Sequence, residues 1–188
     1  ASSSSCIFSP NPEDTSVARR LAEEFGPAES GRHVLIAPGG GMNPGAVDLT
    51  KRWPAERYAA LGDHLVNEFG VHISLIGTAS DANSIGAVKR AMTCPMTDLT
   101  GRTSFGQLGA LMSQSQLVIG NDSAATHLSI SVGTPTVTVF TSTEPWIYGS
   151  DEKHAASVST GSPEEGLREI PTVEMVLAAA RQLLRGAN

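Results

Sequence analysis

A polar run that follows an apolar strand carries the clearest chemical signal in the sequence. The segment Asn121-Asp122-Ser123-Ala124-Ala125-Thr126-His127 precedes small residues that favour a helix. Free N–H groups at 123–125, together with the helix dipole, predict a site for an anion. We expect Asp122 to accept hydrogen bonds from ligand hydroxyls, and His127 can face the same site from one helical turn after Ser123. The alternative is that Asp122 or Ser123 only caps the helix and that His127 packs in the core.

A second signal is the string Lys51-Arg52-Trp53-Pro54. Pro54 fits the first turn of a helix, where its missing N–H costs nothing. A lysine directly before a helix N-terminus is unfavourable because the helix dipole is positive there, and a bound anion would compensate for this. We therefore expect Lys51 to contact an anion. The alternative is that Lys51 and Arg52 are solvated surface charges.

Two further turns follow apolar strands. The string Pro38-Gly39-Gly40-Gly41 lets the backbone approach a ligand closely, so its N–H groups are candidates for phosphate contacts. It matches neither GxGxxG nor GxxxxGK[ST], and a tight loop is the alternative. Asp81 ends the turn that begins at Gly77, and an acidic residue after such a strand often binds the two hydroxyls of a ribose. The alternative is that Asp81 caps the following helix.

Apolar runs and helical periodicity alternate along the chain and predict the elements that position these turns. Strands are expected over residues 33–37, 71–76, 97–100, 116–119, 136–140 and 155–158. Helices are expected over residues 12–25, 54–69, 82–92, 104–114, 123–133 and 172–184. The segments 38–50 and 141–151 are expected to be loops.

This alternation predicts an α/β fold, namely a single Rossmann-like, doubly wound parallel sheet. Continuous apolar strands fit a sheet that is buried on both faces. We assign residues 12–188 to this domain and residues 1–11, which include a serine run, to a linker or tail within a longer protein. Ligands bind such sheets at the carboxyl ends of the strands, where the turns at Gly39, Asp81 and Asp122 should meet.

Composition limits the class of function. The chain has 188 residues and a formal net charge of -6, and without a visible basic face we expect no nucleic-acid partner. Cys6 and Cys94 lie far apart and no CxxC or Asp-x-Asp motif occurs, so neither a disulfide framework nor a metal site is expected. No apolar run approaches the ~20 residues that cross a bilayer, and no signal peptide is visible, so we expect a cytoplasmic protein.

Three strings together resemble one family. They are PGGG…KRWPAERYAALGDHL (38–65), GTASD (77–81) and GNDSAATHLSISVGTPTVTVF (120–140). They resemble the heptosyltransferases of glycosyltransferase family 9, which transfer heptose from ADP-heptose to the inner core of lipopolysaccharide. The resemblance runs from about Ile7 to the chain end. It implies the C-terminal, nucleotide-sugar-binding half of a two-domain GT-B fold, whose N-terminal half holds the acceptor site and the catalytic base.

The resemblance implies an inverting displacement in which a nucleoside diphosphate leaves. Lys51 is similar to the lysine that contacts the donor diphosphate, and Asp122 to the acid that contacts the sugar; we assign the catalytic roles of this chain to these two residues. Lys51 and the helix N-terminus at Ser123 would stabilise charge on the leaving phosphates. His127 matches a histidine beside the donor sugar. The chain alone is expected to bind the donor without transferring the sugar.

Further roles follow from the same resemblance. Ser123 and the N–H groups of Ala124 and Ala125 would hold the phosphates, Asp81 would bind the ribose, and Thr103 would flank the base. The complete predicted donor-binding set is Gly39, Gly40, Lys51, Asp81, Thr103, Asp122, Ser123, Ala124, Ala125 and His127. No cofactor is expected beyond the nucleotide-sugar donor, ADP-heptose or a similar molecule.

The sequence departs from the family in three places, which leaves the sugar and nucleotide open. Ala124 replaces a glycine. The loop before Lys51 is longer and holds Pro44-Gly45-Ala46, a second candidate for the family's Pro-Gly-Ala string. Thr141-Ser142-Thr143-Glu144-Pro145 replaces Gly-Pro-Thr-Asp-Pro.

The alternative functions are a stand-alone nucleotide-binding module, a subunit of a split enzyme, or a GT-B protein resembling the UDP-N-acetylglucosamine epimerases. In a full-length transferase the partners would be the N-terminal half and a lipid-linked glycan acceptor, with peripheral attachment at the inner membrane.

Overall fold

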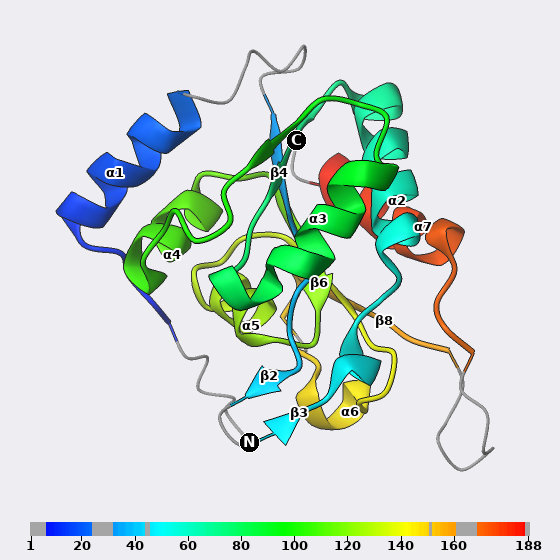
Figure 1. The fold of residues 1–188 in the computed structure, drawn as a ribbon. Helices are drawn as coiled ribbons and strands as arrows, with labels where there is room; N and C mark the ends of the chain where they lie inside the picture. The colour runs from blue at the N-terminus through cyan, green and yellow to red at the C-terminus, as the bar shows by residue number, and fades with distance from the viewer. Residues whose placement is uncertain (1–6, 24–31, 44–45, 151, 161–168, 187–188) are drawn as a thin grey trace.

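The computed structural model describes residues 7–23, 32–43, 46–150, 152–160 and 169–186. A parallel sheet forms its centre (Figure 1). The sheet has six strands in the order β5-β4-β1-β6-β7-β8. The strands are β1 (His33–Ala37), β4 (His72–Leu75), β5 (Met96–Asp98), β6 (Leu117–Asn121), β7 (Thr136–Val139) and β8 (Ala155–Val158). This order is that of the doubly wound Rossmann sheet, in which the direction of winding reverses beside the first strand. The predicted fold class is confirmed.

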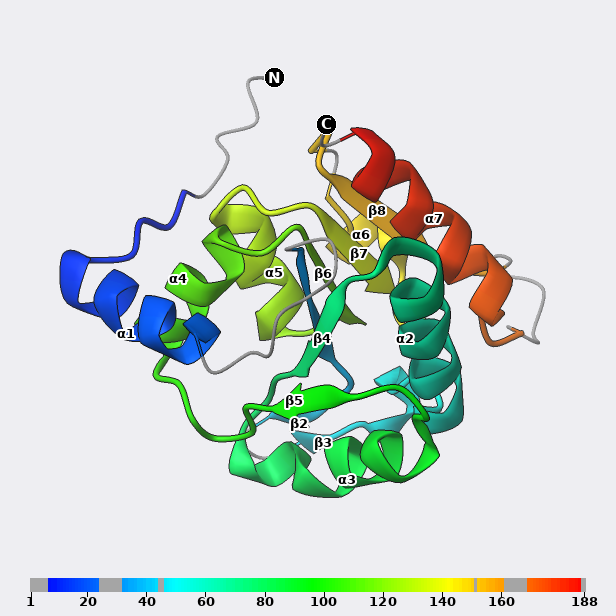
Figure 2. The same ribbon diagram turned by 90° about the horizontal axis from the view of Figure 1, so that it is seen from above.

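Helices cover both faces of the sheet, as the view from above shows (Figure 2). One face is covered by α1 (Pro12–Glu23), α4 (Phe105–Ser113) and α5 (Ala124–Ser131). The other face is covered by α2 (Ala55–Phe69), α3 (Ala82–Ala91) and α7 (Val173–Gly186). Among the described residues no helix is both long and apolar enough to cross a membrane.

Strand β1 shows why the sheet requires helices on both sides. Val34 and Ile36 belong to the core beneath α2 and α7, whereas Leu35 and Ala37 belong to the core beneath α4 and α5. All four side chains are buried. A strand that alternates between two apolar cores reads as a continuous apolar run, and this is the pattern that the sequence shows.

Local sequence signals set several helix ends. Gly70 ends α2 in the left-handed conformation, with φ of 60°. Ser104 and Gln107 form a reciprocal capping box that opens α4. The Thr172 hydroxyl accepts a 3.3 Å hydrogen bond from the Met175 N–H in the first turn of α7.

Both segments predicted to be loops contain short elements, so these predictions were wrong in part. The first contains the antiparallel strands β2 (Met42–Asn43) and β3 (Ala46–Val47), followed by the 3-10 helix η1 (Leu49–Lys51). The second contains the four-residue helix α6 (Pro145–Tyr148). Elements this short give no periodic signal, because a single turn cannot repeat an apolar spacing.

The segment before α1 lies against the domain. The Phe8 N–H donates a 2.9 Å hydrogen bond to the Ser131 carbonyl, and the Phe8 ring meets that of Phe105 edge-on at 5.8 Å between centroids. Residues 1–6 of the predicted tail lie outside the described residues, as do the predicted helix end at Phe25 and the Pro44-Gly45 pair.

Candidate functional site

A cavity of about 620 Å³ opens at the carboxyl ends of the strands where the winding of the sheet reverses. It lies beside the turns that follow β1, β4 and β6, the place where doubly wound sheets bind ligands. All ten residues of the predicted donor-binding set line it. The structure therefore brings together every residue of this set: those on the turns after β1, β4 and β6, with Lys51 from the 3-10 helix η1 and Thr103 from the segment before α4.

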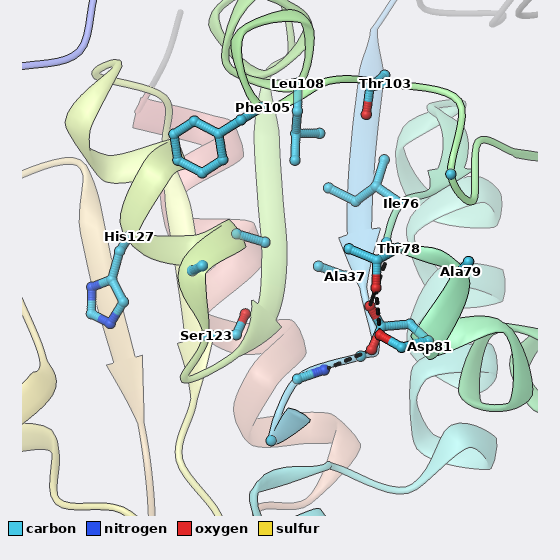
Figure 3. Close-up of a pocket in the computed structure, with 18 of the residues that line it drawn as sticks. Ala37, Ile76, Thr78, Ala79, Asp81, Thr103, Phe105, Leu108, Ser123 and His127 are labelled. Carbon is cyan, nitrogen blue, oxygen red and sulfur yellow. Dashed lines mark hydrogen bonds between the residues drawn. The ribbon is translucent and has the colours of Figure 1, made fainter. Parts of the chain in front are cut away.

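The cavity has three differently built walls (Figure 3). Ser123 and His127 lie on the side formed by α5, and Asp81 lies on the opposite side. Phe105 and Leu108 from α4 close a third side and make it apolar. A ligand with a polar end and a flat apolar group would match these walls.

Lys51, Asp122 and His127 form a hydrogen-bonded polar cluster at the centre of the cavity. The Lys51 Nζ lies 3.3 Å from Asp122 Oδ2, and His127 Nε2 lies 3.1 Å from Asp122 Oδ1. The Asp122 side chain is only 5% exposed, whereas that of His127 is 51% exposed. His127 therefore does not pack in the core, and its ring is accessible to a ligand that contacts Asp122.

The Asp122 carboxyl is held in its charged form. Burial alone would raise its pKa, but hydrogen bonds from His127 and Thr143 and the positive charge of Lys51 outweigh burial and lower the pKa below the ordinary value. Asp122 is consequently an ionised acceptor at neutral pH. An ionised acceptor suits hydroxyl donors such as those of a sugar and repels a phosphate placed directly against it.

The N-terminus of α5 presents backbone donors beside this carboxylate. Ser123 caps the helix reciprocally with Thr126, so the N-cap alternative for Ser123 is correct. Capping by Ser123 uses the N–H of Thr126 and leaves the amides of Ala124 and Ala125 without partners inside the helix. Both alanines line the cavity, where their N–H groups and the helix dipole favour an anion.

A segment that the sequence predicted only as a loop places an aromatic ring beside Lys51. The Nζ of Lys51 lies 5.7 Å from the centre of the Tyr148 ring, and Tyr148 lines the cavity. The Thr141 hydroxyl donates a 2.6 Å hydrogen bond to the Thr50 carbonyl and ties this segment to η1. Sequence reasoning missed Tyr148, because an aromatic residue in a short helix carries no motif of its own.

Arg52 is not a solvated surface charge. Its Nε donates a 2.8 Å hydrogen bond to the Gly40 carbonyl, and its Nη1 donates a 2.7 Å bond to Ser84 Oγ. Its Nη2 lies 3.5 Å from Asp81 Oδ1. Asp81 does not cap the following helix α3 with its side chain; it forms a reciprocal capping box with Thr78 on the short 3-10 helix η2 (Ala79–Asp81) that precedes α3. Arg52 and Asp81 thus join the glycine turn to the start of α3.

Asn121 is the residue with the largest structural role that the sequence did not assign. Its side chain is fully buried at the end of β6. Its Oδ1 accepts hydrogen bonds from the Trp53 N–H at 2.8 Å and the Tyr58 hydroxyl at 2.9 Å. Its Nδ2 donates to the carbonyls of Pro38 and Gly39 at 3.1 and 2.8 Å. One amide therefore holds the glycine turn, the start of α2 and β6 together beneath the cavity.

Within the described part of the chain, no cluster of three or more His, Cys, Asp or Glu side chains is arranged to hold a metal ion. A phosphate in the cavity would meet the positive charge of Lys51 and the neutral N–H donors at the start of α5.

Comparison with known proteins identifies the family. The model of glycosyltransferase family 9 (heptosyltransferase) matches residues 11–172. The chain belongs to this family. The resemblance inferred from the three sequence strings is therefore confirmed.

Individual relatives agree with this assignment. The chain is 29% identical over 137 residues to lipopolysaccharide heptosyltransferase 3 of Escherichia coli, an alignment that covers 68% of this chain and 38% of that protein. The crystal structure of a family 9 glycosyltransferase from Veillonella parvula superimposes with a TM-score of 0.82 at 26% identity, covering 96% of this chain and 54% of that one. The structure of E. coli ADP-heptose LPS heptosyltransferase II, at 22% identity, shares the fold with a TM-score of 0.78 and the same coverage of 96% and 54%. The chain thus spans about half the length of these solved structures and less of the curated relative.

Proposed function

We propose that this chain is the donor-binding part of an inverting glycosyltransferase and that its cavity binds a nucleoside-diphosphate sugar of the ADP-heptose kind. The observation that carries the proposal is the pairing of Lys51 with the buried, ionised Asp122 at the N-terminus of α5, inside a cavity large enough for a nucleotide. Family membership supplies the reaction class, and the names of two relatives mention heptose transfer and ADP-heptose.

The cavity suggests how the donor would be divided among its walls. The diphosphate would lie against Lys51 and the amides of Ala124 and Ala125, where a cation and a helix N-terminus meet. The base would occupy the apolar side formed by Phe105 and Leu108. The sugar would lie towards Asp122, which accepts hydrogen bonds from its hydroxyls.

In the proposed reaction an acceptor hydroxyl attacks the anomeric carbon and the nucleoside diphosphate leaves. Negative charge grows on the leaving phosphate, so donors that are already fixed in place stabilise the transition state more than the ground state. Lys51 is fixed by Asp122 and by the Tyr148 ring before any ligand arrives. No metal ion or further cofactor is part of this proposal.

The proposal assigns the acceptor site and the base that deprotonates the acceptor to a part of a longer protein outside this chain. The acceptor would be a lipid-linked glycan of lipopolysaccharide core synthesis. We also propose that the protein is cytoplasmic and that the longer enzyme attaches peripherally to the inner membrane.

Calorimetric titration of ADP, UDP and GDP into the chain tests the nucleotide, and titration of ADP-heptose tests the sugar. We expect ADP to bind most tightly and the Asp122→Asn variant to weaken ADP-heptose binding much more than ADP binding. The matched control is Asp63→Asn, because Asp63 binds the amides of Thr93 and Cys94 away from the cavity. Failure of all three nucleotides to bind would overturn the proposal, and a preference for UDP would instead favour an epimerase-like protein.

A further inference from the structure

The acidic residue that the sequence assigned to the ribose has no accepting capacity left in this structure. The Oδ1 of Asp81 accepts from the Gly40 N–H at 3.1 Å and from Arg52 Nη2 at 3.5 Å. Its Oδ2 accepts from the N–H and the hydroxyl of Thr78 at 3.0 and 2.8 Å. These donors match the roughly four lone-pair positions of a carboxylate. Because the Asp81 side chain is also only 11% exposed, a ribose hydroxyl could reach it only by displacing one of them.

The Arg52–Asp81 pair instead holds Gly40 at both ends. The N–H of Gly40 donates to Asp81, and its carbonyl accepts from Arg52 Nε. Gly40 has φ of 115°, and a Cβ placed on it would lie 3.2 Å from the Cβ of Ser123. The pair therefore fixes the glycine turn directly beside the N-terminus of α5, on the phosphate side of the cavity.

A hydrogen-bond chain through the hydroxyls of Thr78 and Ser80 leads from the Asp81 carboxylate to the cavity surface. Figure 3 shows the Thr78–Asp81 end of this chain. The single hydroxyl hydrogen of Thr78 is given to Asp81 Oδ2. The 2.7 Å contact between Thr78 Oγ1 and Ser80 Oγ must therefore use the hydrogen of Ser80. Ser80 Oγ keeps its acceptor lone pairs, and donation along a chain that ends on a carboxylate makes it a stronger acceptor.

The positions of the three side chains agree with this hydrogen-bond chain. Thr78 and Ser80 are exposed and line the cavity, whereas Asp81 is buried beneath them. A Cβ placed on Gly39 would lie 2.2 Å from the Asp81 carboxyl carbon, which shows that the carboxyl group packs directly against the backbone of the glycine turn. A ligand in the cavity would meet the two hydroxyl groups before the carboxylate.

We propose that the hydroxyls of Ser80 and Thr78 contact the ribose of the bound nucleotide, while Asp81 and Arg52 are positioning residues that orient these hydroxyls and the glycine turn. This inference rests on the proposed function, since it requires a nucleotide in the cavity. It assigns ribose recognition to neutral hydroxyl groups in place of the carboxylate.

The test compares the dissociation constants of ADP, 2′-deoxy-ADP and 3′-deoxy-ADP by calorimetry. The unaltered chain should bind at least one deoxy nucleotide more weakly than ADP by about 2- to 10-fold, the effect of one hydrogen bond. In Ser80→Ala this ratio should fall, because one of the two hydroxyl partners of the ribose is gone, and in the double variant with Thr78→Val it should reach about one. In Arg52→Gln, ADP should bind more weakly but the ratio should persist. In Asp81→Asn, which loses the carboxylate that orients the hydroxyls, the ratio should shrink but stay above one.

A comparison of ADP with adenosine separates the positioning role of Arg52 from a general loss of structure. Because the pair holds the glycine turn on the phosphate side, Arg52→Gln should weaken ADP more than it weakens adenosine. The control Asp63→Asn, which removes a carboxylate that binds backbone amides elsewhere, should leave both comparisons unchanged.

The outcomes separate this inference from the function on which it rests. A ratio that persists in Ser80→Ala, or one that vanishes in Asp81→Asn, would overturn the inference while ADP binding itself is retained. Equal weakening of ADP and adenosine in Arg52→Gln would overturn the positioning role. No ADP binding by the unaltered chain would overturn the proposed function and the inference together. If Asp81→Asn does not fold, Ser80→Ala decides, since Ser80 is exposed.

Discussion

Asn121 and Trp53 are 68 residues apart in the sequence, yet the buried Asn121 Oδ1 accepts a 2.8 Å hydrogen bond from the Trp53 N–H. The same oxygen accepts the Tyr58 hydroxyl, whose burial raises its pKa well above the ordinary value and keeps it a donor. Through this amide the residues after Lys51 are fixed relative to the end of β6, and Lys51 itself can face Asp122.

Replacing Asn121 with alanine should lower the free energy of unfolding by about 2–4 kcal/mol, because several buried backbone and side-chain groups lose a partner at once. Chemical denaturation followed by circular dichroism measures this. The matched control is Asn83→Ala on the exposed surface of α3, which should change stability by less than about 0.5 kcal/mol. Equal effects of the two substitutions would show that the buried amide does not organise the site.

The sequence predicted where β6 and α5 lie but not the role of Asn121. It placed Gly120 and Asn121 in a turn, whereas both pair with β7, opposite Thr138 and Val139. A polar residue at a strand end looks like turn chemistry, because the partners that satisfy it come from distant segments and leave no local pattern. For the same reason the sequence could not show that Arg52 is half-buried.

Gly39→Ala should destabilise the chain by about 1–3 kcal/mol and weaken nucleotide binding, because the new Cβ would overlap the Asp81 carboxyl group. Thermal unfolding and calorimetry with ADP measure the two effects. Gly86→Ala is the matched control: it lies inside α3, where the nearest atom to a new Cβ is Arg90 Nη1 at 3.4 Å. That substitution should stabilise the chain by about 0.5–1 kcal/mol, since alanine favours a helix interior. Similar losses in both variants would contradict the packing of Asp81 under Gly39.

The candidate site was predictable to the extent that strand ends converge in a parallel sheet. The turns after β1, β4 and β6 meet because the strands that precede them are neighbours, and motif residues on these turns could be named in advance. Phe105 and Tyr148 could not, since each lines the cavity from the surface of a helix. An exposed aromatic residue has no sequence signature that separates a ligand wall from ordinary surface.

Asp98 gives a pH-dependent contribution to stability that can be isolated. Burial opposes its ionisation, but the hydrogen bond from Lys89 at 2.6 Å and those from Thr100 lower its pKa to about 2. A depressed carboxyl pKa stabilises the fold above the unfolded-state value near 4 and loses this contribution as the pH falls towards about 2. Asp98→Asn should therefore cost about 1 kcal/mol at pH 7, after allowance for solvent screening, and almost nothing near pH 2. Urea unfolding across this range tests it; a cost independent of pH would contradict the ion pair.

Lys51→Met should weaken ADP binding by about 10- to 100-fold, because a charged hydrogen bond to the diphosphate would be lost while methionine keeps the length of the side chain. The remaining binding should also depend less on salt, since one cation no longer contributes to attraction of the ligand. Calorimetry at two KCl concentrations measures both changes. Lys89→Met is the matched control, because Lys89 also pairs with a carboxylate but does not line the cavity.

Removing Lys51 leaves Asp122 without its positive neighbour, so ADP binding by Lys51→Met should recover partly in the double variant with Asp122→Asn. If the double variant binds ADP no better than Lys51→Met, Asp122 does not repel the phosphates, and the division of the cavity into a sugar side and a phosphate side is wrong.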